Sequence, residues 1–194
     1  MAPPTADPAL FTQAVASLRS VQPRPEIELD EAPAPQRLAP YAHAVNASVV
    51  RDDDEIATGR LILLHDPAGH ESWQGTLRQV TYVNATLEPE MGTDPLLPAV
   101  GWSWLTDALS EQEARAAAIG GTVTQTFSTR FGDLAGPPPD AEIEIRASWT
   151  ALDGHLDRHL RAWTTLLAST AGLPPPGVAR LPERGGRGGR PDQA

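Results

Sequence analysis

The sequence contains no cysteine, and this absence excludes several kinds of structure and chemistry. Without thiols the chain can form no disulfide bond and no thiolate zinc site, and it has no cysteine nucleophile. Long apolar runs are absent too, since no stretch approaches the roughly 18 residues of a transmembrane helix. The opening residues, MAPPTADPALF, have neither the basic start nor the apolar stretch of a secretory signal. We therefore expect a cytoplasmic protein without a membrane partner.

Lysine is absent as well, because all 15 basic residues are arginines; with abundant alanine, proline and glycine, this is typical of a gene under strong G+C bias. The charges are distributed unevenly along the chain. Residues up to Pro176 carry 23 acidic side chains and 11 arginines, a balance of −12, whereas the residues from Gly177 onward carry 2 acidic side chains and 4 arginines, a balance of +2. We expect the body to repel phosphate and the tail to attract it.

The apolar pattern predicts helices and strands in the order α-ββββ-α-ββ-α. Helices are expected over residues 8–21, 94–121 and 153–171, and strands over 26–30, 41–50, around 61–64, 76–87, 121–131 and 141–150. Since no βαβ rhythm and no internal repeat are present, this order predicts an α+β domain: one antiparallel sheet of about five to six strands, with helices packed on one face. A single domain is expected over residues 8–173, between a flexible segment at 1–7 and a disordered tail at 174–194 that is rich in proline, glycine and arginine.

Two local features of this pattern are less regular. In the second helical segment Ser110 and Glu113 match a capping box, which predicts that a second short helix begins there. In the fourth strand the apolar phase shifts between Leu77 and Val80, which indicates a bulge.

The stretch LILLHDPAGHESWQG contains four side chains that could bind a metal or transfer protons: His65, Asp66, His70 and Glu71. It also has the features of a hairpin loop, in which Asp66 and Pro67 open the turn and Gly69 supplies a positive φ. We favour the loop, because two histidines spaced across a loop fix no ligand geometry and a third ligand would have to come from elsewhere. Trp73 is then expected to cap the end of the sheet, and it is kept as a candidate binding residue.

Glu88 and Glu90 follow the fourth strand and, with His65 or His70, form the one constellation that we would test for catalysis. Nucleophile motifs of the GxSxG type, glycine-rich phosphate loops and dinucleotide fingerprints are absent from the sequence. We therefore assign no catalytic residue and expect no cofactor and no bound metal. A hydrolase that uses these four side chains is retained as an alternative.

His155 and His159 stand four residues apart in the last predicted helix, so they would share one helix face, as metal-binding pairs do. Their segment, HLDRH, lacks the glutamate that follows the first histidine of a zinc-protease motif. We therefore expect a solvated or boundary pair at the margin of the apolar stripe of Leu156, Leu160 and Trp163.

Trp102 and Trp104 are two residues apart on one predicted helix, so they cannot both face the same core. If Trp104 lies in the apolar stripe, Trp102 points elsewhere: it is either an exposed anchor for a partner or packed beneath the proline-rich connector. Because a tryptophan near the surface is a frequent anchor in interfaces, the helix over 94–109 is our first candidate for an interface, with Trp102 as its binding residue.

The segment ERGGRGGRP near the end of the chain resembles the RGG segments that bind RNA through charge and stacking. The arginines that would make this contact are Arg184, Arg187 and Arg190. The segment has no aromatic residue and adjoins an acidic body, so we favour a disordered tail over an RNA-binding one.

Five blocks of sequence, in this order, carry a resemblance to a known family: RPEIEL, RLAPYAHAV, LILLHDPAGHESWQGT, LEPEMGTDPLLPAVGWSWL and EIEIRASWT. Together they resemble an actinobacterial family of domains of unknown function, the one numbered three thousand, over nearly all residues from Phe11 to Pro175. The resemblance implies a cytoplasmic protein without an assigned activity, often encoded beside a ribonuclease D-like gene, and it supplies no catalytic residue. In fold alone, the element order is similar to that of secretion chaperones, which bind extended polypeptide and usually dimerise; this chain has one strand more, at 26–30.

Three functions follow, in order of preference. The first is a non-enzymatic protein-interaction or regulatory domain that binds an unidentified protein through the 94–109 helix or the open face of the sheet, with a homodimer as one form. The second is an accessory to RNA processing that uses the tail. The third is the hydrolase.

Overall fold

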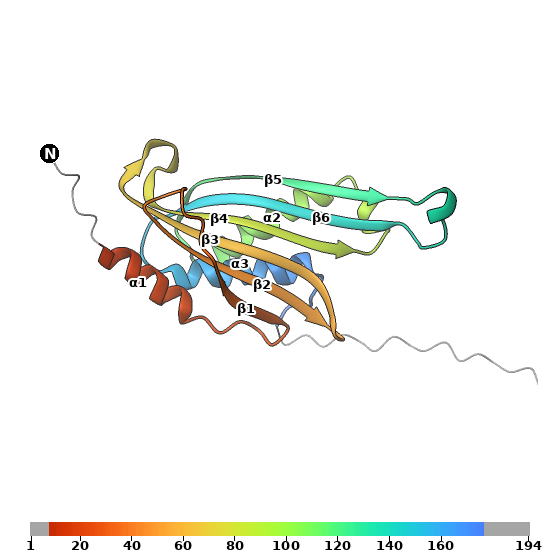
Figure 1. The fold of residues 1–194 in the computed structure, drawn as a ribbon, viewed down its shortest axis with the longest axis horizontal. Helices are drawn as coiled ribbons and strands as arrows, with labels where there is room; N and C mark the ends of the chain where they lie inside the picture. The colour runs from red at the N-terminus through yellow and green to blue at the C-terminus, as the bar shows by residue number, and fades with distance from the viewer. Residues whose placement is uncertain (1–7, 177–194) are drawn as a thin grey trace, which may run out of the picture.

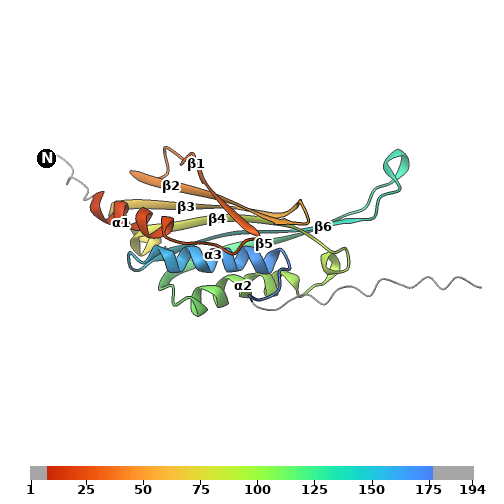
Figure 2. The same cartoon turned by 90° about the horizontal axis from the view of Figure 1, so that it is seen from below.

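Residues 8–176 are described by the structure, which is a computed structural model. Within them, one antiparallel sheet of six strands is covered on one face by three α-helices, as Figure 1 and Figure 2 show. The helices are α1 (Pro8–Arg19), α2 (Leu97–Glu111) and α3 (Leu156–Thr170). The strands are β1 (Ile27–Ala32), β2 (Tyr41–Arg51), β3 (Asp54–His70), β4 (Gly75–Leu87), β5 (Ala116–Ser128) and β6 (Asp140–Ala151). The predicted α+β architecture and element order are confirmed.

The strands follow the order β1-β2-β3-β4-β6-β5, so β1 and β5 form the two edges of the sheet. All neighbouring strands are antiparallel. After β4 the chain passes through α2 on the helix-covered face, returns along the far edge as β5 and turns back into β6. The hairpin that joins β5 to β6 projects beyond the rest of the sheet (Figure 2).

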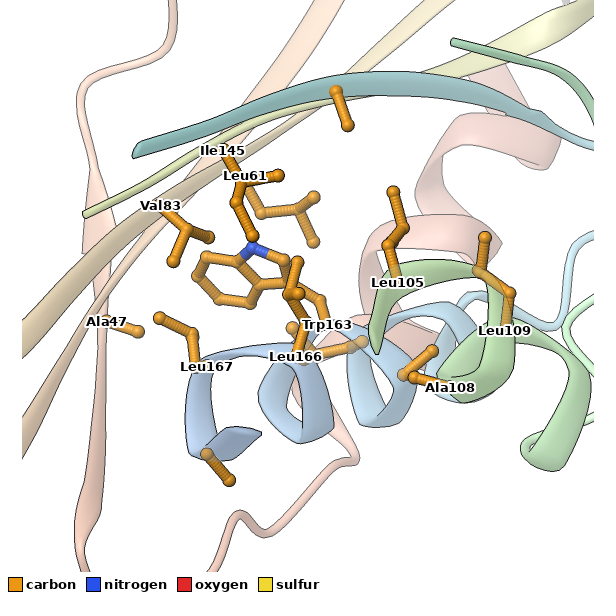
Figure 3. Packing of buried hydrophobic residues seen from close by; sticks show 14 of the residues in the cluster. Ala47, Leu61, Val83, Leu105, Ala108, Leu109, Ile145, Trp163, Leu166 and Leu167 are labelled. Carbon is orange, nitrogen blue, oxygen red and sulfur yellow. The ribbon is translucent and has the colours of Figure 1, made fainter. Parts of the chain in front are cut away.

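The core lies between the sheet and α3, with Trp163 near its centre among side chains of β2, β3 and β4 (Figure 3). The indole Nε1 of Trp163 donates a 2.6 Å hydrogen bond to Thr81 Oγ1, which satisfies the polar atom of this buried ring. β3 passes close to the ring because residue 59 is glycine: a Cβ at Gly59 would lie 2.9 Å from Trp163 Cζ2 and from Leu167 Cδ2. The sequence of β3 therefore fits the shape of α3.

The second helical segment is shorter than the sequence pattern predicts, and the short helix expected at Ser110 is wrong. α2 ends at Glu111, and Glu113 then adopts a left-handed φ of 51° that stops the helix. The alanines that follow pair with the end of β6, with Ala116 opposite Ala151. Alanine favours a helix over most residues by less than about 1 kcal/mol, so the pairing with β6 decides the conformation.

The bulge expected in the fourth strand is also wrong. The pairing of β4 with its two neighbours runs without a register shift from Leu77 to Ala85. The apolar phase changes because polar side chains, Gln79 and Thr81, occupy buried positions on the helix-covered face, while Val80 lies on the other face.

The longest helices of residues 8–176 have 15 residues each, and none is long and apolar enough to cross a membrane. The predicted domain limits, residues 8–173 with a terminal segment on either side, stay a prediction, because residues 1–7 and most of the tail lie outside the described residues.

Candidate functional site

The histidine-rich stretch forms the end of the hairpin between β3 and β4, and its side chains serve the local backbone. The turn lies later than expected, in the short helix η1 (Glu71–Trp73), where His70 Nδ1 accepts a hydrogen bond from Ser72 N at 3.3 Å. Asp66 Oδ1 accepts one from Ala68 N at 3.0 Å, and Gly69 has a positive φ of 74°.

The four side chains of the hydrolase hypothesis are not brought together. His65 is buried against the rings of Phe11 and Tyr41, and its Nδ1 donates to Thr76 O at 2.9 Å. Its partner in β4 is Leu77, and eleven residues of extended strand, about 36 Å, separate that position from the exposed Glu88, with Glu90 beyond it. Among residues 8–176 there is no cluster of three or more His, Cys, Asp or Glu side chains that could hold a metal ion.

The tryptophans selected from the sequence are half-buried. Trp73 is half-buried in η1, its ring lies 5.6 Å from that of His70, and its carbonyl oxygen accepts a hydrogen bond from Thr150 Oγ1, so it closes the end of the sheet. Trp102 and Trp104 are both half-buried against the core. The exposed apolar side chain of α2 is instead Val100.

His155 and His159 differ from the expected boundary pair. His155 is exposed at the start of α3, whereas His159 is fully buried and its Nδ1 accepts a 3.0 Å hydrogen bond from Trp149 Nε1. Burial lowers the pKa of His159 to about 4, so the ring is neutral at pH 7. The candidate RNA contacts Arg184, Arg187 and Arg190 lie outside the described residues.

The face of the sheet opposite the helices presents its side chains in rows, because the register aligns the outward residues of neighbouring strands. One row consists of Asp30, Asn46, Arg60, Tyr82, Arg146 and Thr122. The adjacent row consists of Ala32, Ala44, Ile62, Val80, Ser148 and Gly120. A hollow of about 420 Å³ lies over both rows where they cross β3, β4, β6 and β5. One side of this hollow is basic and aromatic, and the other side is mostly apolar.

The two arginines that line the hollow differ in how their charge is balanced. Arg146 Nε pairs with Glu144 Oε1 at 2.7 Å, and its guanidinium lies over the ring of Tyr82, 5.6 Å from the centroid. Arg60 Nη2 donates to the carbonyl oxygen of Pro33, and no acidic side chain within residues 8–176 lies at ion-pair distance from Arg60. The positive charge of Arg60 is therefore available to a ligand.

A third arginine fixes the strand that borders the hollow. Arg78 Nη1 donates to Ala118 O at 2.9 Å and Nη2 donates to Ser148 Oγ at 2.6 Å, and burial lowers the pKa of Arg78. Ala118 lies in the register shift of β5 with a left-handed φ of 48°, so Arg78 holds this irregular segment in place. Next to it, a Cβ at Gly120 would meet no atom within 4 Å, whereas a Cβ at Gly121 would lie 2.2 Å from a backbone oxygen of β6.

The lining of the hollow offers hydrogen-bond donors and apolar surface. It contains no Asp, Glu, His or Cys side chain. A guanidinium offers paired N–H donors to a carboxylate, and Ile62 and Val80 offer apolar surface beside it. The hollow thus suits a ligand that presents an anionic group and an apolar group side by side.

Sequence reasoning named the open face of the sheet as one possible binding surface but did not identify the residues of this hollow, although part of the signal was present. The alternation of β6 correctly predicts that Arg146 and Ser148 face outward from the core. Arg60 belongs to a strand that is apolar on both faces in sequence, and its proximity to Arg146 depends on the pairing of β3 with β4 and of β4 with β6.

Comparison with known protein families places the chain in a family. The family described as "Protein of unknown function (DUF3000)" matches residues 7–179, so the chain belongs to it, and the resemblance seen in the sequence blocks is confirmed. Neither the curated proteins nor the solved structures contain a significant match.

Proposed function

We propose that this member of the DUF3000 family is a non-enzymatic protein-interaction domain that binds an extended, acidic segment of a partner protein across the open face of its sheet. The observation that carries the proposal is the hollow in which Arg60 and Arg146 flank Tyr82 beside an apolar row. The proposal includes a cytoplasmic location. The chain has no cysteine, so it needs no oxidising compartment to maintain a disulfide bond.

Charge favours an acidic ligand in the hollow. The body of the protein has a balance of −12, so most of its surface repels an acidic segment. Like Arg37, Arg51 and Arg78, Arg60 forms no ion pair with an acidic side chain within residues 8–176, and of these four arginines it is Arg60 that lines the hollow. A carboxylate that reaches Arg60 gains a charge-assisted hydrogen bond without displacing an existing ion pair.

The size of the hollow favours an extended polypeptide. It spans β3, β4, β6 and β5, and three intervals of about 4.8 Å between neighbouring strands give a width of about 14 Å. An extended chain covers this width in roughly four residues. The basic and apolar rows are two residues apart along each strand, about 7 Å, so an acidic side chain and a neighbouring apolar one can each reach its own row.

The proposal is tested with two fluorescein-labelled pools of degenerate octapeptides. In the first pool Asp or Glu alternates with Leu, Val or Phe; in the second pool Asn and Gln replace the acids. We expect fluorescence anisotropy to show that the acidic pool binds at least about tenfold more tightly than the amide pool, as a charge-assisted hydrogen bond provides. Arg60→Met should remove this preference, and Gly120→Leu should weaken binding by filling the hollow.

Arg161→Met is the matched control, because Arg161 lies on α3 at the opposite face of the sheet. It should bind the acidic pool as the wild-type protein does. Equal binding of the two pools, or wild-type binding by a folded Gly120→Leu variant, would overturn the proposal. Far-UV circular dichroism establishes that each variant is folded.

A further inference from the structure

We propose that two copies of this chain associate through β5, which pairs antiparallel with β5 of the second copy about a two-fold axis at Thr124. This goes beyond the proposed binding of a partner segment. β5 is an edge of the sheet and is thirteen residues long, without a charged residue or a proline. From Ile119 to Ser128 its backbone makes no hydrogen bond within residues 8–176 except those that pair it with β6.

The opposite edge of the sheet shows how an edge strand is normally protected. β1 has six residues and carries three acidic side chains, Glu28, Asp30 and Glu31. Short length and inserted charge both discourage pairing with another chain. β5 has neither protection from Gly121 to Ser128, so its free N–H and C=O groups are available to another strand.

Charge makes a second copy a suitable occupant of this edge. Each copy carries a net charge of −10, so two copies associate only through a surface that keeps their acidic residues apart. β5 provides such a surface because it carries no charge. A strand of opposite charge, in contrast, would gain no ion pair from the side chains of β5.

The sequence of β5 also suits antiparallel pairing with β5 of a second copy. The regular part of the strand runs from Gly120, where its register shift ends, to Ser128, and the midpoint of this segment is Thr124. An axis at Thr124 places Thr122 opposite Thr126, and it places Phe127 opposite Gly121, which has no side chain to obstruct the ring. Threonine pairs and an aromatic ring over an edge glycine both stabilise adjacent strands.

Exposed apolar side chains gather along the same edge. They come from η2 (Met91–Thr93) and α2, from β5 itself and from the projecting hairpin: Met91, Val100, Ile119, Phe127, Phe131 and Leu134. Gln125 Nε2 donates to Gly92 O at 2.6 Å and so fastens η2 to β5. Phe131 is 79% exposed on the hairpin that extends past the sheet in Figure 2. A stable interface of about 1,200 Å² or more needs such apolar contacts besides a strand pair.

The experiment is analytical ultracentrifugation of the full chain between about 1 and 100 μM, with like and unlike charges placed on the axis. Thr124 is exposed and outward-facing, so it tolerates substitution. We expect a wild-type dimer, and we expect Thr124→Glu and Thr124→Arg each to raise the dissociation constant at least about tenfold, because each variant opposes like charges across the axis. An equimolar mixture of the two variants should dimerise again, and the neutral control Thr124→Val should dimerise as the wild type does.

A wild-type protein that stays monomeric at 100 μM would overturn the inference, and so would a folded Thr124→Glu variant that remains dimeric. A mixture of the Glu and Arg variants that stays monomeric would overturn the two-fold pairing at Thr124. The same variants test the proposed peptide binding independently of the dimer. Thr124→Glu should lose the dimer and keep its binding of the acidic peptide pool, whereas Arg60→Met should lose that binding and keep the dimer.

Discussion

His159 gives a quantitative prediction about how stability depends on pH. The ring is fully buried in α3 and accepts a hydrogen bond from Trp149 Nε1, while its own Nε2 has no partner within residues 8–176. Burial lowers the pKa of His159 from 6.5 to about 4, against the smaller opposing effect of the carboxylates of Asp153 and Asp157. Protonation would place an uncompensated charge in the core.

The sign and size of the effect follow from this shift. Between pH 6.5 and pH 4 the unfolded chain binds a proton at position 159 that the folded chain does not bind. The free energy of unfolding therefore has its full value above pH 6.5 and decreases as the pH falls toward 4. For one histidine with these two pKa values, the loss is about 2 kcal/mol between pH 7 and pH 5, and about 3 kcal/mol by pH 4.

The assay compares the wild type with His159→Gln by urea unfolding at pH 7, 6, 5 and 4, followed by tryptophan fluorescence. The glutamine amide is neutral at every pH, and its carbonyl oxygen can accept the Trp149 hydrogen bond. Other groups with lowered pKa values, including His43 and Asp157, titrate in both proteins and cancel in the difference. The wild type should lose about 2 kcal/mol more than the variant between pH 7 and pH 5. Two parallel curves would refute the assignment of a neutral, buried His159.

Three further predictions concern the packing of the sheet, each measured by urea or thermal unfolding. Gly59→Ala should lower the free energy of unfolding by about 1–3 kcal/mol, because the new Cβ would lie 2.9 Å from the Trp163 ring; an unchanged midpoint would contradict this close contact. Thr81→Val should cost about 1–3 kcal/mol by leaving the buried indole N–H of Trp163 without an acceptor, and no cost would show that another acceptor replaces it. Gly121→Ala should cost at least about 2 kcal/mol because its Cβ would lie 2.2 Å from a backbone oxygen, whereas Gly120→Ala should be nearly neutral; equal melting temperatures would contradict the difference between these positions.

Helices and strands with one solvent-exposed face and one buried face could be predicted from the sequence. The alternation of β6 identifies its inward residues, from Ile143 to Trp149, and the helical spacing of α3 identifies Leu160 and Trp163 as core residues. In both elements a local period alone decides which side chains are buried. The boundary between α2 and β5 could not be found in this way, because a run of alanines followed by glycine suits either conformation until β6 is beside it.

The burial of polar residues in the core could not be predicted from the local sequence either. Thr81 and His159 are buried because each has a tryptophan N–H for a partner, and that partner belongs to a different element of the fold. Nothing in the neighbourhood of either residue in the sequence shows the partner. The phase shift between Leu77 and Val80 consequently suggested a bulge in β4, and His159 suggested the margin of a helix stripe.

The candidate binding surface depends on register, which is a property of strand pairs. Local alternation tells only which face of the sheet Arg60, Tyr82 and Arg146 occupy; a slip of two residues between β3 and β4 would keep that face and still separate Arg60 from Tyr82. The hairpin between these strands is irregular, since residues 66–69 of β3 lie across from one residue, Thr76, of β4. The histidine-rich stretch lies in this irregular hairpin, and the register of the two strands that the hairpin joins aligns Arg60 with Tyr82.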